Sequence, residues 1–214
     1  MVIINMEKER YLRELYSRNP PGSLDRLKDK VVGIAGAGGL GSNIAVSLLR
    51  SGVQRFIIAD HDRVELSNLN RQHYFADQVG MDKTAALAQN LRRINPYVEV
   101  ISHCLRITAD NLAAIFASAQ LLIEAFDAAE MKAIAAQSWT KAYPGRFLVM
   151  GSGVSGYGGS DAIGVTVRGK LVICGDQKTP CTPEAGLTAS RLGIVAQMQA
   201  NAALEILLDG GIHS

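Results

Sequence analysis

The sequence has 214 residues, of which 48% are hydrophobic and 20% are charged, and its formal net charge is +2. A chain of this length can bury a sizeable core and still fold as one domain. We therefore expect a single domain over residues 1–214, with residues 1–22 as an N-terminal helical extension. The net charge is small and the charged residues are spread along the chain. This argues against a basic stripe that binds nucleic acid and against a membrane-binding face, so neither nucleic acid nor a membrane is expected as a partner.

Cysteine content and hydropathy indicate in which cellular compartment the protein is expected. The N-terminus becomes charged within its first ten residues, and no run approaches the roughly 20 apolar residues that span a bilayer, so a cytoplasmic location is predicted. The three cysteines form no Cys-x-x-Cys pair, which favours free thiols and predicts that zinc is absent. Cys104 and Cys174 are expected to be small buried side chains.

Hydrophobic periodicity predicts a helix over residues 6–17, outside the main sheet, followed by strands that alternate with helices. Strands are expected at 31–35, 56–59, 98–101, 121–123 and 147–150, and helices at 40–51, 81–94, 110–116 and 129–142. This alternation is typical of an α/β, Rossmann-like fold with a mostly parallel sheet and helices on both faces.

The last third of the chain differs in pattern. Two short β-like runs, 163–167 and 171–173, predict an antiparallel C-terminal addition to the sheet, and residues 189–208 predict a closing helix. Between them, residues 175–186 have no periodicity and are expected to form a long loop.

A glycine-rich turn follows the first predicted strand with the pattern Gly-x-Gly-x-x-Gly. Such glycines let the backbone approach a phosphate, and the next helix directs its N-terminal N–H groups at it. By itself the turn is typical of a dinucleotide-binding protein. The candidate nucleotide-contacting glycines are Gly36, Gly38, Gly39 and Gly41.

The residues after the second strand favour a triphosphate. Asp60 ends that strand, nineteen positions after Gly41, where a carboxylate hydrogen-bonds a ribose hydroxyl of NAD or ATP. Arg71 and Lys83 follow, and cations here can neutralise charge on a phosphate chain. Asp127 follows the fourth strand at the same edge of the sheet, and a lone carboxylate beside phosphates suits Mg²⁺. A helix N-cap is the alternative role for Asp127.

Together these residues resemble the ThiF-type adenylyltransferases, bacterial relatives of the ubiquitin-activating and molybdopterin-synthase-activating enzymes. The resemblance covers nearly the whole chain and is similar to the shorter branch of the family, which lacks zinc-binding cysteine pairs. Its motifs lie at residues 35–43, 60–64, 67–72, 80–83, 124–127 and 191–201.

The resemblance implies a reaction. The C-terminal Gly-Gly carboxylate of a small ubiquitin-like sulfur-carrier protein attacks the α-phosphorus of ATP, which yields an acyl-adenylate and pyrophosphate, with thiamine thiazole synthesis as the leading pathway. The incoming carboxylate is already ionised, so no enzyme nucleophile is needed, and catalysis reduces to positioning and electrostatics.

The resemblance also implies roles for residues. The glycine turn lies against the nucleotide, Asp60 takes the ribose, Asp127 binds Mg²⁺, and the remaining implied nucleotide-binding positions are Ser67, Asn68, Asn70, Arg71, Lys83 and Ala128. Several relatives carry an asparagine where this chain has Ala128, so any contact of that side chain is missing. Arg18 matches an arginine that relatives insert into the neighbouring subunit's site, which implies a homodimer; an exposed helix-end charge is the alternative.

Two features of the last third remain open. Cys181 stands in the loop where longer relatives use a cysteine for sulfur transfer. No histidine, and no basic residue beyond Lys178, neighbours it to activate the thiol, so we favour a bystander thiol. The glycine-rich residues 151–159 form either a flexible connection or a channel along which a Gly-Gly tail lies, and we favour the channel.

Three other functions are compatible with parts of the sequence. An NAD-dependent oxidoreductase leaves Arg71, Lys83 and Asp127 unexplained. A non-catalytic scaffold of the same fold has no need to retain these side chains. Adenylation of another substrate, a tRNA base or a peptide, uses the same site, but a tRNA substrate favours a more basic surface than a net charge of +2 indicates.

Overall fold

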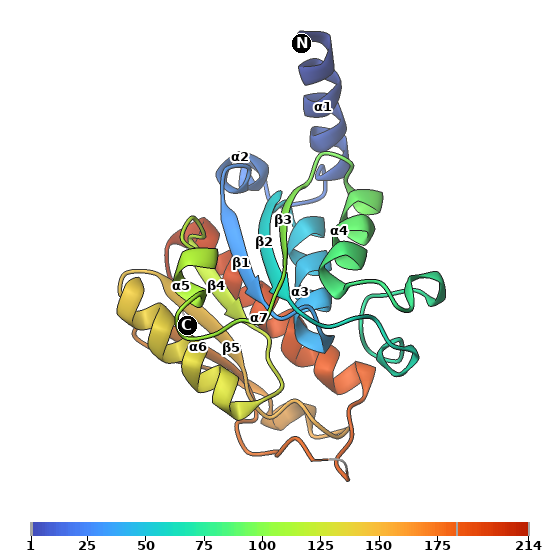
Figure 1. The fold of residues 1–214 in the computed structure, drawn as a ribbon. Helices are drawn as coiled ribbons and strands as arrows, with labels where there is room; N and C mark the ends of the chain where they lie inside the picture. The colour runs from blue at the N-terminus through green and yellow to red at the C-terminus, as the bar shows by residue number, and fades with distance from the viewer. Residues whose placement is uncertain (1, 183, 214) are drawn as a thin grey trace.

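A seven-stranded sheet forms the centre of the computed structural model, which describes residues 2–182 and 184–213 (Figure 1). The strand order is β3-β2-β1-β4-β5-β7-β6, and every neighbouring pair is parallel except β7 and β6, which are antiparallel. The mostly parallel, Rossmann-like sheet and its antiparallel C-terminal addition are thereby confirmed. The strands are β1 (Val31–Ala35), β2 (Arg55–Asp60), β3 (Glu99–Cys104), β4 (Leu121–Glu124), β5 (Phe147–Gly151), β6 (Gly164–Arg168) and β7 (Leu171–Gly175).

Helices cover both faces of this sheet, as expected (Figure 1). One face packs against α3, α4 and α7, and the other against α5 and α6. The N-terminal helix α1 projects from the body of the protein. The helices are α1 (Val2–Leu15), α2 (Ser23–Leu27), α3 (Gly39–Arg50), α4 (Lys83–Ile94), α5 (Leu112–Ile115), α6 (Ala129–Ala142) and α7 (Ala189–Asp209), with short 3₁₀ turns at Leu66–Asn68, Ala76–Gln78 and Ser160–Ala162.

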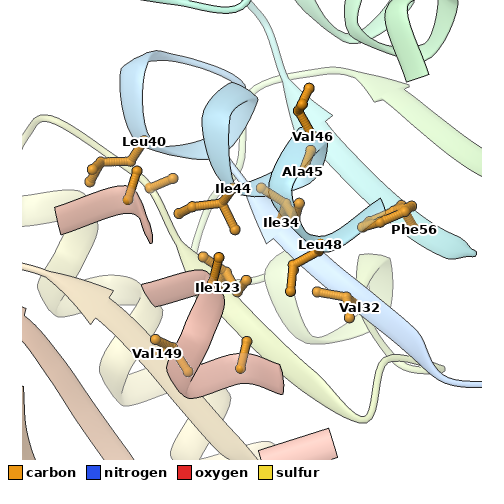
Figure 2. Packing of buried hydrophobic residues seen from close by; sticks show 14 of the residues in the cluster. Val32, Ile34, Leu40, Ile44, Ala45, Val46, Leu48, Phe56, Ile123 and Val149 are labelled. Carbon is orange, nitrogen blue, oxygen red and sulfur yellow. The ribbon is translucent and has the colours of Figure 1, made fainter. Parts of the chain in front are cut away.

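Two hydrophobic cores result from the alternation of side chains along the strands. Ile34 and Ile123 point to the larger core and meet Ile44 and Leu48 of α3 (Figure 2). Leu122 points the other way, towards the fully buried Trp139 of α6. Because both faces are covered, the central strands read as continuous apolar runs in the sequence.

The structure differs from the sequence-based expectations in several places. The first helix spans Val2–Leu15 rather than residues 6–17, and α2 was not predicted, because five residues are too few to show a helical period. The prediction that Cys104 is buried is wrong: its side chain is exposed because β3 is an edge strand whose residues are mostly accessible. Cys174 is buried, as predicted. Within residues 2–182 and 184–213, none of the helices is both long and apolar enough to cross a membrane.

A buried ion pair connects segments of the C-terminal third of the chain. Arg191 in the first turn of α7 lies 2.5 Å from the carboxylate of Asp176, which follows β7, and also donates to the carbonyl oxygen of Gly158. Asp176 in turn accepts the backbone N–H groups of Lys178 and Thr179. One arginine therefore connects the glycine-rich segment, the loop after β7 and the closing helix.

Gly41 and Gly193 give opposite predictions for alanine substitution. A Cβ on Gly41 would overlap the carbonyl oxygen of Gly36, whereas a Cβ on Gly193, inside α7, would meet no atom within 4 Å. We expect Gly41→Ala to lower the free energy of unfolding by about 1–3 kcal/mol. Gly193→Ala should raise it by about 0.5–1 kcal/mol, because alanine is the better helix former. Urea unfolding measures both, and a stable Gly41→Ala protein would contradict the packing described.

Asp176 predicts a pH dependence. Burial opposes ionisation of its carboxyl, but hydrogen bonds from Thr179 and Lys178 and the charge of Arg191 outweigh it and lower the pKa to about 2. Since the unfolded chain binds this proton more tightly, the stabilisation is complete above about pH 4 and is lost as the pH falls towards 2. In Asp176→Asn, the urea midpoint should be lower near neutral pH and fall less between about pH 4 and 2 than in the parent protein. Equal acid sensitivity of the two proteins would count against this assignment.

Candidate functional site

The carboxyl ends of five parallel strands, β1 to β5, open into one cavity of about 630 Å³. This is where ligands bind in open α/β sheets. The charged side chains on its wall have both signs. They are Asp60, His61, Asp62, Arg63, Glu65, Arg71, Lys83, Arg106, Asp127 and Lys132.

The glycine turn between β1 and α3 forms one wall of the cavity. Gly36 has a φ of 102°, and a Cβ on Gly39 would lie 2.6 Å from Cδ1 of Leu192. At Gly38 the first atom met by a Cβ is the amide nitrogen of Gln72, 4.0 Å away, so the backbone itself faces the cavity there. Since α3 begins at Gly39, its N-terminal N–H groups lie at this wall. A phosphate fits this cradle of small residues and backbone donors.

Asp60 joins the glycine turn to the end of β2. One carboxylate oxygen accepts the backbone N–H of Ala37 at 2.6 Å, and the other accepts that of Asp62 at 2.8 Å. Each carboxylate oxygen has a second lone pair, so the half-buried side chain can still accept from a ribose hydroxyl. The contacts with Ala37 and Asp62 hold Asp60 in place before any ligand arrives.

Helix α3 holds the segment 67–72 beside the glycine turn. Nδ2 of Asn43 donates to the carbonyl oxygen of Arg71 at 2.9 Å, and Oγ of Ser42 accepts the N–H of His73 at 3.0 Å. Asn68 is buried, and its Oδ1 accepts the N–H of Glu65 at 3.1 Å. These contacts place Asn68 and Arg71 on the cavity wall.

Lys83 is buried and paired. Its Nζ lies 2.8 Å from the carboxylate of Asp62, and only 6% of the residue is exposed. Partial burial opposes ionisation of Asp62, but the hydrogen bond and charge of Lys83 outweigh it and lower the Asp62 pKa. Lys83 is therefore a fixed positive charge at the cavity wall rather than a solvated surface cation.

Asp127 also lines the cavity, in the turn between β4 and α6, which lies beside the glycine turn because Ala125 donates to the carbonyl oxygen of Ala35 at 2.9 Å. Ala128 is the N-cap of α6 and no side chain caps this helix, so the alternative role of Asp127 as N-cap is wrong. The residue is exposed and lines the same cavity as the phosphate cradle. Mg²⁺ takes one or two carboxylates together with phosphate oxygens, and this donor set fits it.

The cavity wall includes most but not all of the predicted site residues. Gly36, Gly38, Gly39, Asp60, Asn68, Arg71, Lys83, Asp127 and Ala128 line it, whereas Gly41, Ser67, Asn70 and Arg18 do not. Gly41 is buried in the first turn of α3, beneath the turn. Ser67 and Asn70 are exposed, and Asn70 accepts a hydrogen bond from Arg71 at 2.8 Å. Arg18 is exposed beyond the end of α1.

Sequence reasoning missed several charged and polar groups of this wall. Asp62 and Gln72 stand inside motifs that were recognised, so proximity in sequence to Asp60 and Arg71 was an available signal. Arg106 and Lys132 carry no such signal, because their places depend on the packing of β3 and α6. Cys181 also lines the cavity, which the unpatterned loop sequence could not show.

Comparisons with known proteins agree on the family. The ThiF family model matches residues 11–213. Ubiquitin-like modifier-activating enzyme 5 from Drosophila sechellia is 43% identical over 97 residues, and that from Drosophila melanogaster 42%. Each match covers 45% of this chain and only 24% of the relative, so about a quarter of these longer enzymes is matched.

Solved structures share the fold. The Escherichia coli tRNA N6-threonylcarbamoyladenosine dehydratase, TcdA, superposes with a TM-score of 0.83 at 21% identity, covering 92% of this chain and 95% of that one. Its complex with ATP gives a TM-score of 0.81 at 22% identity, with 95% of both chains covered. Escherichia coli MccB with ATP gives 0.70 at 21% identity, over 87% of this chain and 58% of MccB.

The family model spans nearly all of the chain, and its match includes the glycine turn, Asp60, the segment 67–72 and Asp127. The sheet order and the helices on both faces are those of the TcdA fold. On these grounds the chain belongs to the ThiF family.

Proposed function

We propose that this protein uses ATP to adenylate the C-terminal Gly-Gly carboxylate of a ubiquitin-like sulfur-carrier protein, with thiamine thiazole synthesis as the pathway served. The observation that carries the proposal is the charge arrangement of one cavity. A phosphate cradle, the cations Arg71 and Lys83, and the carboxylate-bearing Asp127 all line it. The matched ubiquitin-like modifier-activating enzymes support an acceptor of the ubiquitin-like class.

Different residues bind different parts of ATP and its metal ion. The glycine turn receives phosphate oxygens through backbone N–H groups, and Asp60 accepts from the ribose. Arg71 and Lys83 hold positive charge beside the phosphate chain, and Asp127 would hold Mg²⁺. When bound, Mg²⁺ supplies Lewis-acid neutralisation of phosphate charge.

The reaction needs no nucleophile from the enzyme. A carboxylate oxygen of the carrier's last glycine forms a bond to the α-phosphorus, and the bond from that phosphorus to the bridging oxygen of pyrophosphate breaks. The protein must bring two anions into line and stabilise the charge that moves to pyrophosphate. Fixed cations such as the buried Lys83 suit this task, because they need no reorganisation during the reaction.

An oxidoreductase is less well supported by the same cavity. Hydride transfer between NAD and a substrate does not need a carboxylate that faces the phosphate site or a buried lysine beside it. The glycine-rich segment adds to the case for a protein tail: Gly151, Ser152, Gly153 and Val154 line the cavity and offer a wall of small side chains. A channel for a Gly-Gly tail requires such a wall.

ATP–pyrophosphate exchange tests the proposal. The purified protein with Mg²⁺ should exchange label only when a Gly-Gly-ended sulfur carrier is present. Asp127→Ala should lower this exchange at least about 100-fold, because the charge of the pyrophosphate leaving group is then poorly neutralised. Asp161→Ala, an exposed aspartate outside the cavity, is the matched control and should retain wild-type exchange.

The same assay separates other acceptors. TcdA is by name a tRNA-modifying enzyme, and MccB was solved with MccA, so tRNA and a short peptide are the acceptors to compare with the carrier. Exchange with tRNA or peptide but not with any carrier would replace the proposed acceptor. ATP binding without exchange under any of these conditions would support a non-catalytic scaffold.

The homodimer and the role of Arg18 form part of the proposal. Arg18 is exposed and absent from its own chain's cavity wall, and it follows a helix that projects from the body (Figure 1). A second copy must therefore supply this arginine if it contacts phosphate. We expect Arg18→Ala and Lys83→Met each to lose activity when alone.

Mixing the two variants tests supply of Arg18 in trans. In a mixed dimer, the subunit with intact Lys83 receives the intact Arg18 of its partner, so one of the two sites is complete. Random mixing should restore about a quarter of wild-type exchange, since half of the dimers are mixed. No recovery in a mixture shown to contain mixed dimers would place Arg18 outside the site.

A further inference from the structure

A buried ion pair stands behind the turn that carries Asp127. Glu124 is the last residue of β4 and is 0% exposed. Nζ of Lys132, on α6, lies 3.0 Å from Oε1 and 3.1 Å from Oε2 of this carboxylate. Burial raises the Glu124 pKa, and Lys132 opposes that effect by favouring the charged form. Lys132 is therefore the charged partner of this buried carboxyl group.

Lys132 has no hydrogen-bond donor left for a ligand. An ammonium group has three N–H donors. Two point to the oxygens of Glu124, and the carbonyl oxygen of Gly151 lies 3.0 Å from the same nitrogen. Although Lys132 lines the cavity, its contacts are internal. Any effect of Lys132 on a bound ligand must therefore pass through Glu124 and Gly151, to which it is hydrogen-bonded.

The groups it holds determine where Asp127 lies. Oε1 of Glu124 also accepts the backbone N–H of Phe126 at 2.6 Å, which fixes the turn one residue before Asp127. Gly151 ends β5, the neighbouring strand, so Lys132 ties this turn to the sheet. From the other side, the side chain of Gln199 on α7 donates to the carbonyl oxygen of Glu124 at 3.2 Å. The turn is thus held at Glu124 and Phe126 while Asp127 stays exposed.

We propose that Lys132 is a positioning residue for Mg²⁺ binding: through Glu124 it holds the turn 125–128 in the conformation that presents Asp127 to the metal. The inference rests on the proposed role of Asp127, and it adds two residues that touch neither nucleotide nor metal. Groups that orient a ligating carboxylate commonly change metal affinity 10- to 100-fold when they are removed.

The test is a Mg²⁺ titration of ATP binding, without any acceptor, so that no turnover is involved. For Lys132→Met, we expect the Mg²⁺ concentration at half-maximal effect to rise at least about 10-fold. Affinity for ATP in excess chelator should change less than about 2-fold, because the glycine turn, Arg71 and Lys83 are unchanged. Lys132→Arg should restore most of the Mg²⁺ dependence, since a guanidinium can also pair with Glu124. Lys141→Met, an exposed lysine at the end of the same helix, is the control.

A double-mutant cycle separates this inference from the proposed role of Asp127. If Lys132 acts through Asp127, Lys132→Met should add no further shift when Asp127→Ala is already present. A shift with Asp127→Ala but none with Lys132→Met would overturn the inference alone. No shift with Asp127→Ala would overturn the assignment of Asp127, and the inference with it.

A second variant keeps the test valid even if Lys132→Met does not fold. Lys132→Met leaves a buried carboxylate without its partner, so Glu124→Gln/Lys132→Met, which removes both charges, is titrated in parallel. This double variant should show the same raised Mg²⁺ requirement as Lys132→Met, because the hydrogen bonds from Lys132 to Glu124 and Gly151 are lost in both variants. Equal losses of affinity with and without Mg²⁺, in a folded variant, would show a general structural role and contradict the inference.

Discussion

The carboxylate of Asp60 joins the two segments on which the site is built. It accepts the N–H of Ala37 in the glycine turn and the N–H of Asp62 in the next loop, so the ends of β1 and β2 share one anchor. Asp62 then holds Lys83 through its own carboxylate. Hydroxyl and amide groups of α3 add the segment 67–72 to the same frame. These groups are therefore held by contacts within the protein before a ligand binds, which is what electrostatic preorganisation requires.

The turn that carries Asp127 is organised by a different interaction, the buried pair of Glu124 and Lys132. A buried ion pair is a weak source of stability, because desolvation offsets much of the attraction. Here its hydrogen bonds reach the backbone at Phe126 and Gly151, so the pair sets geometry. Both turns are thus held in a similar way, by a carboxylate at a strand end that accepts backbone N–H groups of the turn beside it. Glu124 pairs with a lysine directly, and Asp60 is linked to one through Asp62.

The sequence predicted the alternation of strands and helices because both faces of the sheet are covered, and covered strands appear as short apolar runs. It predicted the glycine turn, Asp60 and Asp127 because each follows such a run directly. It could not predict that Cys104 is exposed, since nothing in residues 98–104 indicates that β3 is an edge strand. The pairs formed by Lys83 and by Lys132 also escaped it, because each joins residues whose distance depends on how a helix packs.

The strand order has a consequence for how the cavity forms during folding. β1 pairs with β2 from the adjacent part of the chain, but its other neighbour is β4, and Val32 pairs with Leu121, roughly 90 residues later. β1 and β2 can therefore pair through local contacts, whereas β4, which precedes Asp127, comes from a distant segment. The glycine turn itself packs against Leu192 of α7, so during synthesis from the N-terminus the phosphate cradle is complete only when the last helix has been made.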